Sequence, residues 1–180
     1  GVDEATVRKE TVRSLQELSD IASGYGGVGL AFEFLGFAEC SVNTLADAWA
    51  IVQEVDRPNV GLVLDTFHFY AGGSTLESIA DIDPVKLATV RINDAENRPL
   101  AELTDAHRLL PGKGVIPLVD IMAAIEATGW DGVVSVELLR PEYWEWDSLR
   151  LAWEAKAAVK ELLRNTQHGV RNTEHRTPST

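Results

Sequence analysis

An apolar run that stops abruptly at a carboxylate marks the middle of the chain. Val60 to Leu64 reads VGLVL, and Asp65, Thr66 and His68 then bring a carboxylate, a hydroxyl and an imidazole within four positions. This length and β-branched content are typical of a strand that is buried on both faces. In parallel α/β folds the carboxyl ends of strands carry the functional groups. Asp65 and His68 are therefore candidate site residues; the alternative is that they only cap and pack the following turn.

Periodic apolar residues on both sides of this strand predict an alternation of strands and helices. The expected strands cover residues 28–34, 60–64, 86–92 and 133–138, and the longer helices 5–22, 45–55, 118–129 and 147–163. Such alternation predicts parallel pairing with right-handed crossovers. Because a complete (β/α)₈ TIM barrel takes about 250 residues, a chain of 180 residues with four strands predicts an α/β half barrel. We expect this domain over residues 1–164 and a disordered tail over residues 165–180, which lack apolar periodicity.

Charge and cysteine content exclude several classes of protein. The 28 acidic and 16 basic residues give a net charge of −12, which disfavours binding to nucleic acids and to anionic membranes. Cys40 is the single cysteine, so an intrachain disulfide is ruled out and a reducing compartment is favoured. The first twenty residues are charged throughout, which argues against a signal peptide or a membrane span. The sequence predicts a cytoplasmic protein.

Three of the four predicted strands end in an acidic residue. Glu33, Asp65 and Glu137 take these positions. Each could be a helix cap or a surface acid, but carboxylates gathered at one end of a buried sheet repel one another unless a cation or proton compensates. We therefore expect a shared divalent metal site. Oxygen-rich ligands favour Mg²⁺ or Mn²⁺, with Co²⁺ and Zn²⁺ as further candidates.

Several motifs resemble those of a known family. They are AFEFLGF with Glu33, RPNVGLVLDTFHFYAGGS with Asp65 and His68, ELTDAHRLLPGKGVI in the polar loop, and VVSVELLRPEYW with Glu137 and Arg140. Residues 5–163 resemble the second half of the sugar phosphate isomerase/epimerase family, which has the xylose isomerase-like TIM barrel. Within that family the likeness is greatest to inosose (2-keto-myo-inositol) isomerases.

The resemblance implies one divalent ion held by Glu33, Asp65, a histidine and Glu137. The histidine position is Arg91 in this chain. A guanidinium stays protonated and offers no lone pair, so Arg91 cannot be a ligand. Two arrangements follow. Either Arg91 turns away while His68 or water completes the coordination, or Arg91 forms ion pairs with Glu33 or Glu137 in place of the metal.

The same resemblance implies a metal-dependent isomerase or epimerase that acts on a small keto-sugar or cyclitol through an enediolate. Glu33 and Glu137 would be the acid/base pair, with His68 as a proton shuttle or a donor that contacts the ligands.

Charged residues beyond the acids are further candidates for the site, and other functions are open to the same fold. Arg140, Arg91 and Asp105 are the expected substrate contacts, and Arg108 lies in a polar loop, residues 93–114, that could close over the substrate. The alternatives are a dehydroshikimate dehydratase-like lyase, or a non-catalytic half barrel that associates with itself or with a complementing half barrel through its exposed strand edges.

Overall fold

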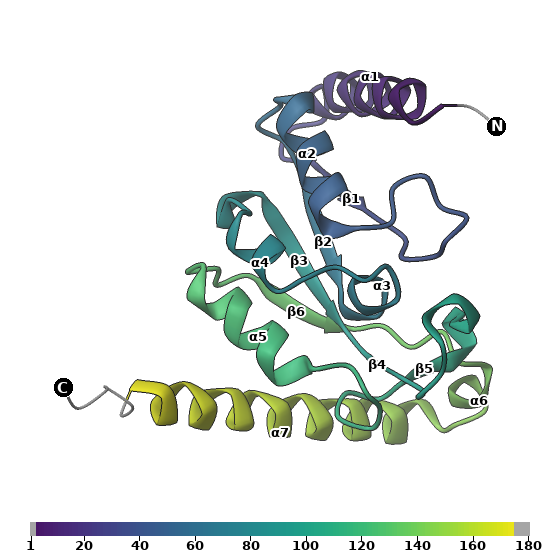
Figure 1. The fold of residues 1–180 in the computed structure, drawn as a ribbon, viewed down its shortest axis with the longest axis vertical. Helices are drawn as coiled ribbons and strands as arrows, with labels where there is room; N and C mark the ends of the chain where they lie inside the picture. Colours follow the sequence, from purple (N-terminus) through teal and green to yellow (C-terminus); the bar gives the residue numbers. More distant parts are fainter. Residues whose placement is uncertain (1–2, 175–180) are drawn as a thin grey trace.

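The computed structural model describes residues 3–174, and its side chains as far as residue 166. A parallel four-stranded sheet forms its centre, in the order β1-β2-β3-β6 (Figure 1). The sheet strands are β1 (Leu30–Glu33), β2 (Val60–Asp65), β3 (Leu87–Ile92) and β6 (Val133–Val136), and a small antiparallel pair is formed by β4 (Asp94–Ala95) and β5 (Arg108–Leu109). The helices are α1 (Glu4–Ser23), α2 (Leu45–Val55), α3 (Thr66–Ala71), α4 (Glu77–Ala80), α5 (Leu118–Ala127), α6 (Pro141–Trp144) and α7 (Ser148–Glu174), with short 3-10 turns at Pro84–Lys86, Leu100–Glu102 and Asp105–His107.

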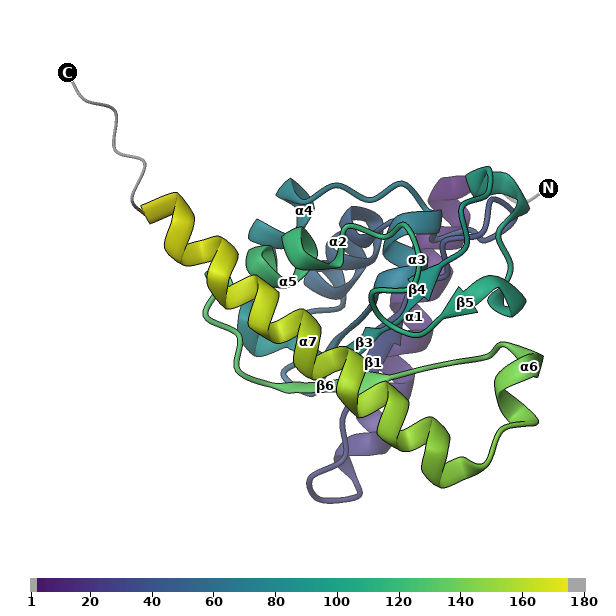
Figure 2. The same cartoon turned by 90° about the horizontal axis from the view of Figure 1, so that it is seen from below.

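Helices cover one face of the sheet. α2, α4 and α5 lie side by side on that face, α1 packs beyond α2 at one end, and α7 packs beyond α5 at the other (Figures 1 and 2). Leu62 and Leu64 of β2 are fully buried in the core between the sheet and these helices, together with Ile51 and Ile121. The apolar spacing of α2 places its buried side chains on one stripe, which explains why the helix lies against the sheet.

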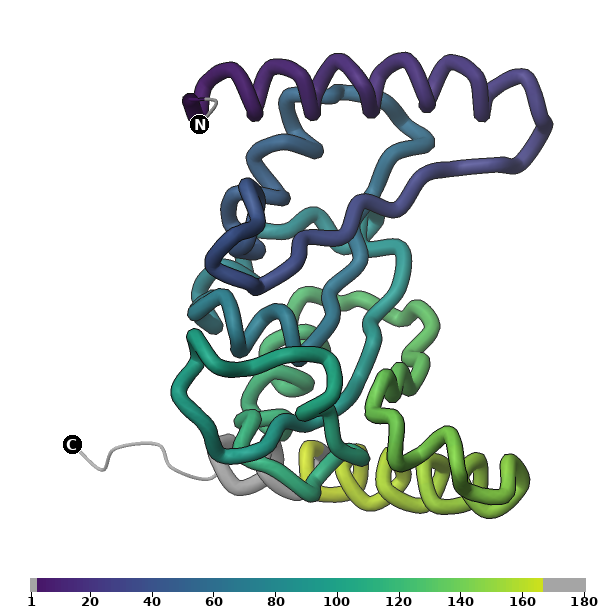
Figure 3. Tube along the Cα trace, turned by 90° about the vertical axis from the view of Figure 1, so that its right-hand side faces the viewer, coloured from purple at the N-terminus to yellow at the C-terminus, as the bar shows by residue number. Residues whose placement is uncertain are grey.

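The opposite face of the sheet is left open by the described residues. Figure 3 looks onto this face, where the strands lie uncovered between α1 and α7. Ala31 of β1 and both Val133 and Ser135 of β6 are exposed there. β1 and β6 are the edge strands, each with a neighbour on one side only. Half of a closed barrel has this arrangement, because its two edge strands lack the neighbouring strands that would close the sheet.

The four sheet strands and the longer helices match the expected order, and the differences lie in the segments between and after them: the predicted polar loop contains β4 and β5, and α6 precedes the last helix. Residues 66–71, directly after β2, form helix α3 rather than a loop, because Asp65 caps that helix. α7 continues to Glu174, ten residues past the predicted domain end at residue 164, and residues 175–180 of the predicted tail lie outside the described residues. Among residues 3–174, none of the helices combines the length and apolarity that a membrane crossing requires.

Candidate active site at the strand ends

Asp65 is both a helix cap and part of a charged cluster. As the last residue of β2, it accepts hydrogen bonds through Oδ1 from the backbone amides of Phe67 (2.8 Å) and His68 (3.1 Å). Its second oxygen, Oδ2, accepts a hydrogen bond from the Asn93 side-chain amide (2.9 Å) and contacts the Arg108 guanidinium at 2.7 Å. Asp65 therefore caps α3 and also belongs to the charged cluster at the strand ends.

Arg108 is the buried cation of the cluster. Its side chain is 1% exposed, and besides Asp65 it contacts Asp105 Oδ1 through Nε (2.8 Å) and lies 4.8 Å from the centre of the Phe67 ring. Burial alone would lower the pKa of Arg108, but Asp65 and Asp105 more than offset this and raise it. Arg108 was expected in a polar loop that could close over substrate; it lies instead in β5 (Arg108–Leu109) and is buried against Asp65.

Three carboxylates converge at the carboxyl ends of the strands. Glu33 ends β1, Asp65 ends β2 and Glu137 follows β6, and each offers a ligand atom that lies within 4.8 Å of the others. We call these three residues the acid triad. The parallel register explains the convergence, because Asp65 pairs with Arg91 and Arg91 with Ser135, two residues before Glu137. Side chains two residues apart on a strand share a face.

Arg91 lies among the carboxylates of the acid triad. Its Nη1 is 2.7 Å from Glu33 Oε2 and 3.0 Å from Glu137 Oε1, while Arg108 Nη1 is 2.7 Å from Asp65 Oδ2 and 3.5 Å from Glu137 Oε2. Of the two arrangements left open by the sequence, the structure has the ion-paired one. The acid triad taken alone could hold a metal ion. As arranged, however, it does not fit one, because Arg91 Nη1 already contacts one oxygen of Glu33 and one of Glu137 and has no lone pair to offer a metal.

Glu33 is electrostatically the most unusual member of the acid triad. Burial raises its pKa, the Arg91 guanidinium opposes that rise, and the charges of Asp65 and Glu137 add to it. Its Oε1 is buried and has no hydrogen-bond partner among the described residues. A carboxyl group with a raised pKa and a free oxygen is suited to accept and return a proton.

His68 is held as a neutral, buried ring. The backbone amide of Gly36 donates to its Nδ1 (3.2 Å), and its Nε2 lies 3.1 Å from Arg108 Nη2. Both neighbours are N–H donors, and a neutral imidazole offers a single acceptor nitrogen, which protonation would remove. Burial lowers the pKa of His68, and the guanidinium of Arg108 contributes to that lowering while Asp65 opposes it. The ring contacts Arg108 and reaches none of the acid triad oxygens through a described hydrogen bond.

Two of the predicted substrate contacts are paired with protein side chains. Arg140 Nη1 lies 2.6 Å from Glu96 Oε1, and Arg140 Nε lies 3.0 Å from Glu142 Oε2. The hydrogen bonds from Arg140 and then Arg98 lower the pKa of Glu96 to about 2. Asp105 is paired with Arg108 and is partly exposed. The structure thus places Arg91 and Arg108 on the acid triad, and Arg140 in a separate ion-pair group.

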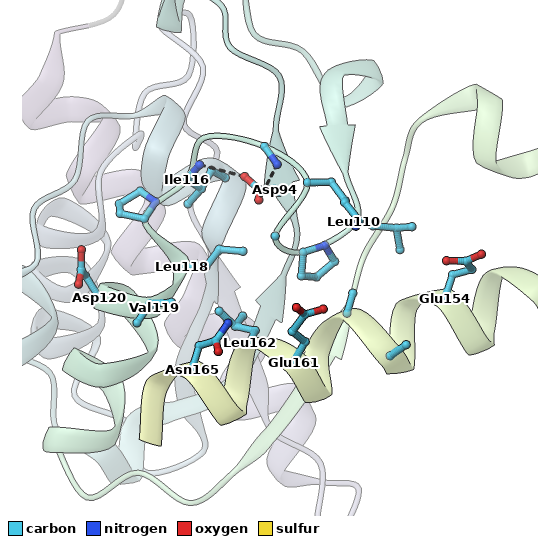
Figure 4. A pocket seen from close by; sticks show the side chains of 17 residues that line it. Asp94, Leu110, Ile116, Leu118, Val119, Asp120, Glu154, Glu161, Leu162 and Asn165 are labelled. Atoms are coloured by element: carbon cyan, nitrogen blue, oxygen red, sulfur yellow. Dashed lines mark hydrogen bonds between the residues drawn. The ribbon is translucent and has the colours of Figure 1, made fainter. Parts of the chain in front are cut away.

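A cavity of about 500 Å³ lies away from the acid triad, between residues 110–120 and α7 (Figure 4). Acidic side chains of α5 and α7 line it together with Asp94. Asp94 is committed to the loop, since its oxygens accept hydrogen bonds from the backbone amides of Gly114 and Ile116, both at 2.9 Å. This cavity contains none of the converging carboxylates, so we place the candidate site at the strand ends instead.

Asn93 is the site residue for which the sequence predicted no role. It is fully buried, donates to Asp65 Oδ2, and accepts a hydrogen bond from Thr66 Oγ1 through its carbonyl oxygen (2.7 Å). The signal available was its position, directly after β3 at the same sheet end as the acids.

Comparisons with known proteins agree with this geometry. A family model described as xylose isomerase-like TIM barrel matches residues 1–166. The inosose isomerase of Bacillus subtilis (strain 168) is 48% identical over 157 residues, which are 87% of this chain and 56% of that protein. A crystal structure of the IolI protein with a bound zinc atom superposes with a TM-score of 0.87 at 42% identity, and covers 90% of this chain and 58% of its own.

A weaker likeness links the chain to a lyase. The 3-dehydroshikimate dehydratase of Pseudomonas aeruginosa is 29% identical over 140 residues, which are 21% of its length. The chain spans about half the length of the inosose isomerase that it matches. The resemblance and the α/β fold of parallel barrel units predicted from the sequence are confirmed by these matches. This chain belongs to the xylose isomerase-like TIM barrel family.

Proposed function

We propose that this chain carries the catalytic half of an isomerase or epimerase that acts on a small keto-sugar or cyclitol of the inosose type. The observation that supports this most is the convergence of three carboxylates from separate strand ends. One oxygen from each of them lies within 4.8 Å of the others. Inosose isomerases are also the most similar of the relatives compared above. A ketone with a neighbouring hydroxyl needs groups that remove and return a proton and groups that stabilise the oxygen as charge develops.

Glu33 and Glu137 are the proposed acid/base pair. One carboxylate takes the proton from the carbon next to the carbonyl, and the C–H electron pair moves toward the carbonyl oxygen to give an enediolate. The proton then returns at the neighbouring carbon or on the opposite face. The raised pKa of Glu33 and its free Oε1 support its part in this transfer.

The guanidinium groups supply the positive charge next to these carboxylates. Arg91 is the member that a substrate can reach, since its side chain is 32% exposed whereas that of Arg108 is 1% exposed. We propose that Arg91 donates N–H groups to the substrate oxygen on which charge develops. Arg108 and His68 position Asp65 and the end of β2 from beneath. The substrate contacts of Arg140 and Asp105 stay predictions, as do the catalytic role of His68 and a cytoplasmic location.

We further propose that a complementing half barrel closes the pocket. Two observations support this. The sheet has an open face and two edge strands, β1 and β6, and the chain spans only about half the length of the inosose isomerase that it matches. Size-exclusion chromatography with light scattering tests it: a second copy gives a dimer, and a different partner gives a larger particle only when that partner is added. A monomer that remains active alone contradicts this part of the proposal.

Deuterium exchange tests the chemistry itself. We expect the protein to exchange the hydrogen on the carbon next to the ketone of inosose for deuterium from D₂O. NMR of inosose measures the rate of this exchange over a range of protein concentrations. Glu137→Gln is expected to reduce the rate about 10²- to 10⁴-fold, the usual range for loss of an acid/base group. Glu142→Gln is the matched control, because Glu142 is exposed and pairs with Arg140 alone among the described residues.

Two results would contradict the proposal: no exchange by the folded protein in its assembled form, with a second copy or an added partner, or equal exchange by the Glu137→Gln variant. Mass analysis of the product also separates isomerisation, which keeps the mass, from the loss of water that a dehydratase produces. The weaker likeness to the dehydratase leads us to expect the first.

A further inference from the structure

The repulsion within the acid triad is already reduced by cations that belong to the chain. Each of its three carboxylates contacts the guanidinium group of Arg91 or Arg108. A divalent ion added between them would lie next to two positive side chains. The electrostatic need for a metal that three clustered acids create is therefore reduced from within.

Arg91 makes contacts of the kind that a bound ion would make. It comes from β3, and its Nη1 contacts Glu33 of β1 and Glu137 of β6, so one nitrogen joins carboxylates from the two edge strands. The three side chains are between 21% and 32% exposed, which leaves the pairs only partly screened by water. A metal that displaced this nitrogen would leave a partly buried guanidinium without these partners.

Arg91 has little freedom to yield its place. Its backbone is fixed in the sheet between Asp65 and Ser135, so only the side chain can turn. The carboxylates of Asp65 and Asp105 are already held by Arg108, which removes them as alternative partners for a displaced guanidinium. We propose that Arg91 stands in place of a divalent cation, so that this chain excludes a metal ion from the acid triad.

Titration with Mn²⁺, followed by the EPR signal of the free ion, tests this inference on the whole chain without an activity assay. The wild type is expected to bind no Mn²⁺ at the acid triad at concentrations that saturate Arg91→His, which supplies a lone pair in place of the cation. We expect the Arg91→His variant to bind one Mn²⁺ per chain. Because the substitution removes a partly buried positive charge from the site, its affinity for Mn²⁺ should be at least about 100-fold higher than that of the wild type.

Matched variants separate the acid triad from other sites. Arg91→Ala removes the guanidinium without adding a ligand and should bind Mn²⁺ with intermediate affinity. Adding Glu137→Gln to Arg91→His should abolish the site, whereas Arg57→His should create none, because among the described residues Arg57 pairs with a single carboxylate, that of Asp20. Circular dichroism melting establishes that each variant is folded.

Two results overturn the inference. The first is a wild type that binds one Mn²⁺ within about threefold of the affinity of Arg91→His and loses it on Glu137→Gln, since Arg91 would then yield to the ion. The second is the absence of any gain in both Arg91→His and Arg91→Ala when they are folded. The deuterium-exchange assay does not enter this test, so each proposal can fail alone.

Discussion

Arg108 Nη1 lies 2.7 Å from Asp65 Oδ2, and the two side chains are 1% and 0% exposed. The pair joins β5 to the end of β2, across a sequence separation that no local pattern reveals. Since Asp65 also caps α3, this contact fixes the strand end, the following helix and one member of the acid triad together. A buried pair of this kind makes the fold dependent on keeping both partners.

Replacing Arg108 with Met should therefore destabilise the protein strongly. Removing one partner of a buried ion pair typically costs about 3–5 kcal/mol in the free energy of unfolding, because the remaining charge stays desolvated. Urea unfolding measures the change. Arg13→Met is the control: Arg13 is 58% exposed and pairs with Glu10 and Glu17 on the surface of α1, so a change within about 0.5 kcal/mol is expected. Equal effects of the two substitutions would contradict the structural role given to Arg108.

A methyl group at Gly36 should disturb the ring of His68. A Cβ there would collide with the backbone oxygen of His68 and would lie 2.6 Å from the amide of Gly72. We expect Gly36→Ala to lower the free energy of unfolding by about 1–3 kcal/mol, the usual cost of overpacking. Gly26→Ala is the matched control, since a Cβ at Gly26 meets nothing within 4 Å. Thermal melts that place both variants at the same stability would disprove the close approach.

The raised pKa of Glu33 predicts a stability that falls with pH. The folded carboxyl group keeps its proton to a higher pH than the unfolded one, whose value is near 4.5. The contribution of Glu33 to the free energy of unfolding is therefore lost as pH rises from 4.5 through the raised pKa of the folded state. Glu33→Gln mimics the protonated form, so the stability of this variant relative to the wild type should increase as pH rises. Urea titrations from pH 4 to pH 8 measure this slope, and a decrease would be the wrong sign.

Glu96 predicts the opposite pH dependence. Its pKa is lowered to about 2 by Arg140 and Arg98, so its contribution is present above 4.5 and is lost as pH falls toward 2. Glu96→Gln should lower the free energy of unfolding at pH 7 by about 0.2–1 kcal/mol, the range for a pair near the surface. The difference from the wild type should shrink between pH 4.5 and pH 2. A difference that stays constant over this window would argue against the ion pairs with Arg140 and Arg98.

Sequence patterns predicted the sheet and the acid triad because both depend on local order. The strand at residues 60–64 is a continuous apolar run, and the acids that follow strands occupy one rim because parallel strands all point the same way. The boundary at residue 164 could not be predicted well, since the helix that crosses it continues to Glu174 without a stop signal at that point. A turn capped by Asp65 was among the expectations, but its extension into helix α3 was not predicted, because six residues are too few to show a helical period.

By itself, the sequence determined the alternation of strands and helices, the family, and the identity of the acids that meet at the strand ends. It also raised the question of Arg91, since a guanidinium in that position must either turn away or pair with the acids. Only the tertiary structure decided this, by placing Arg91 between Glu33 and Glu137 and burying Arg108 under Asp65. The physical reason is that ion pairing depends on distances between side chains far apart in the sequence, and only packing sets those distances.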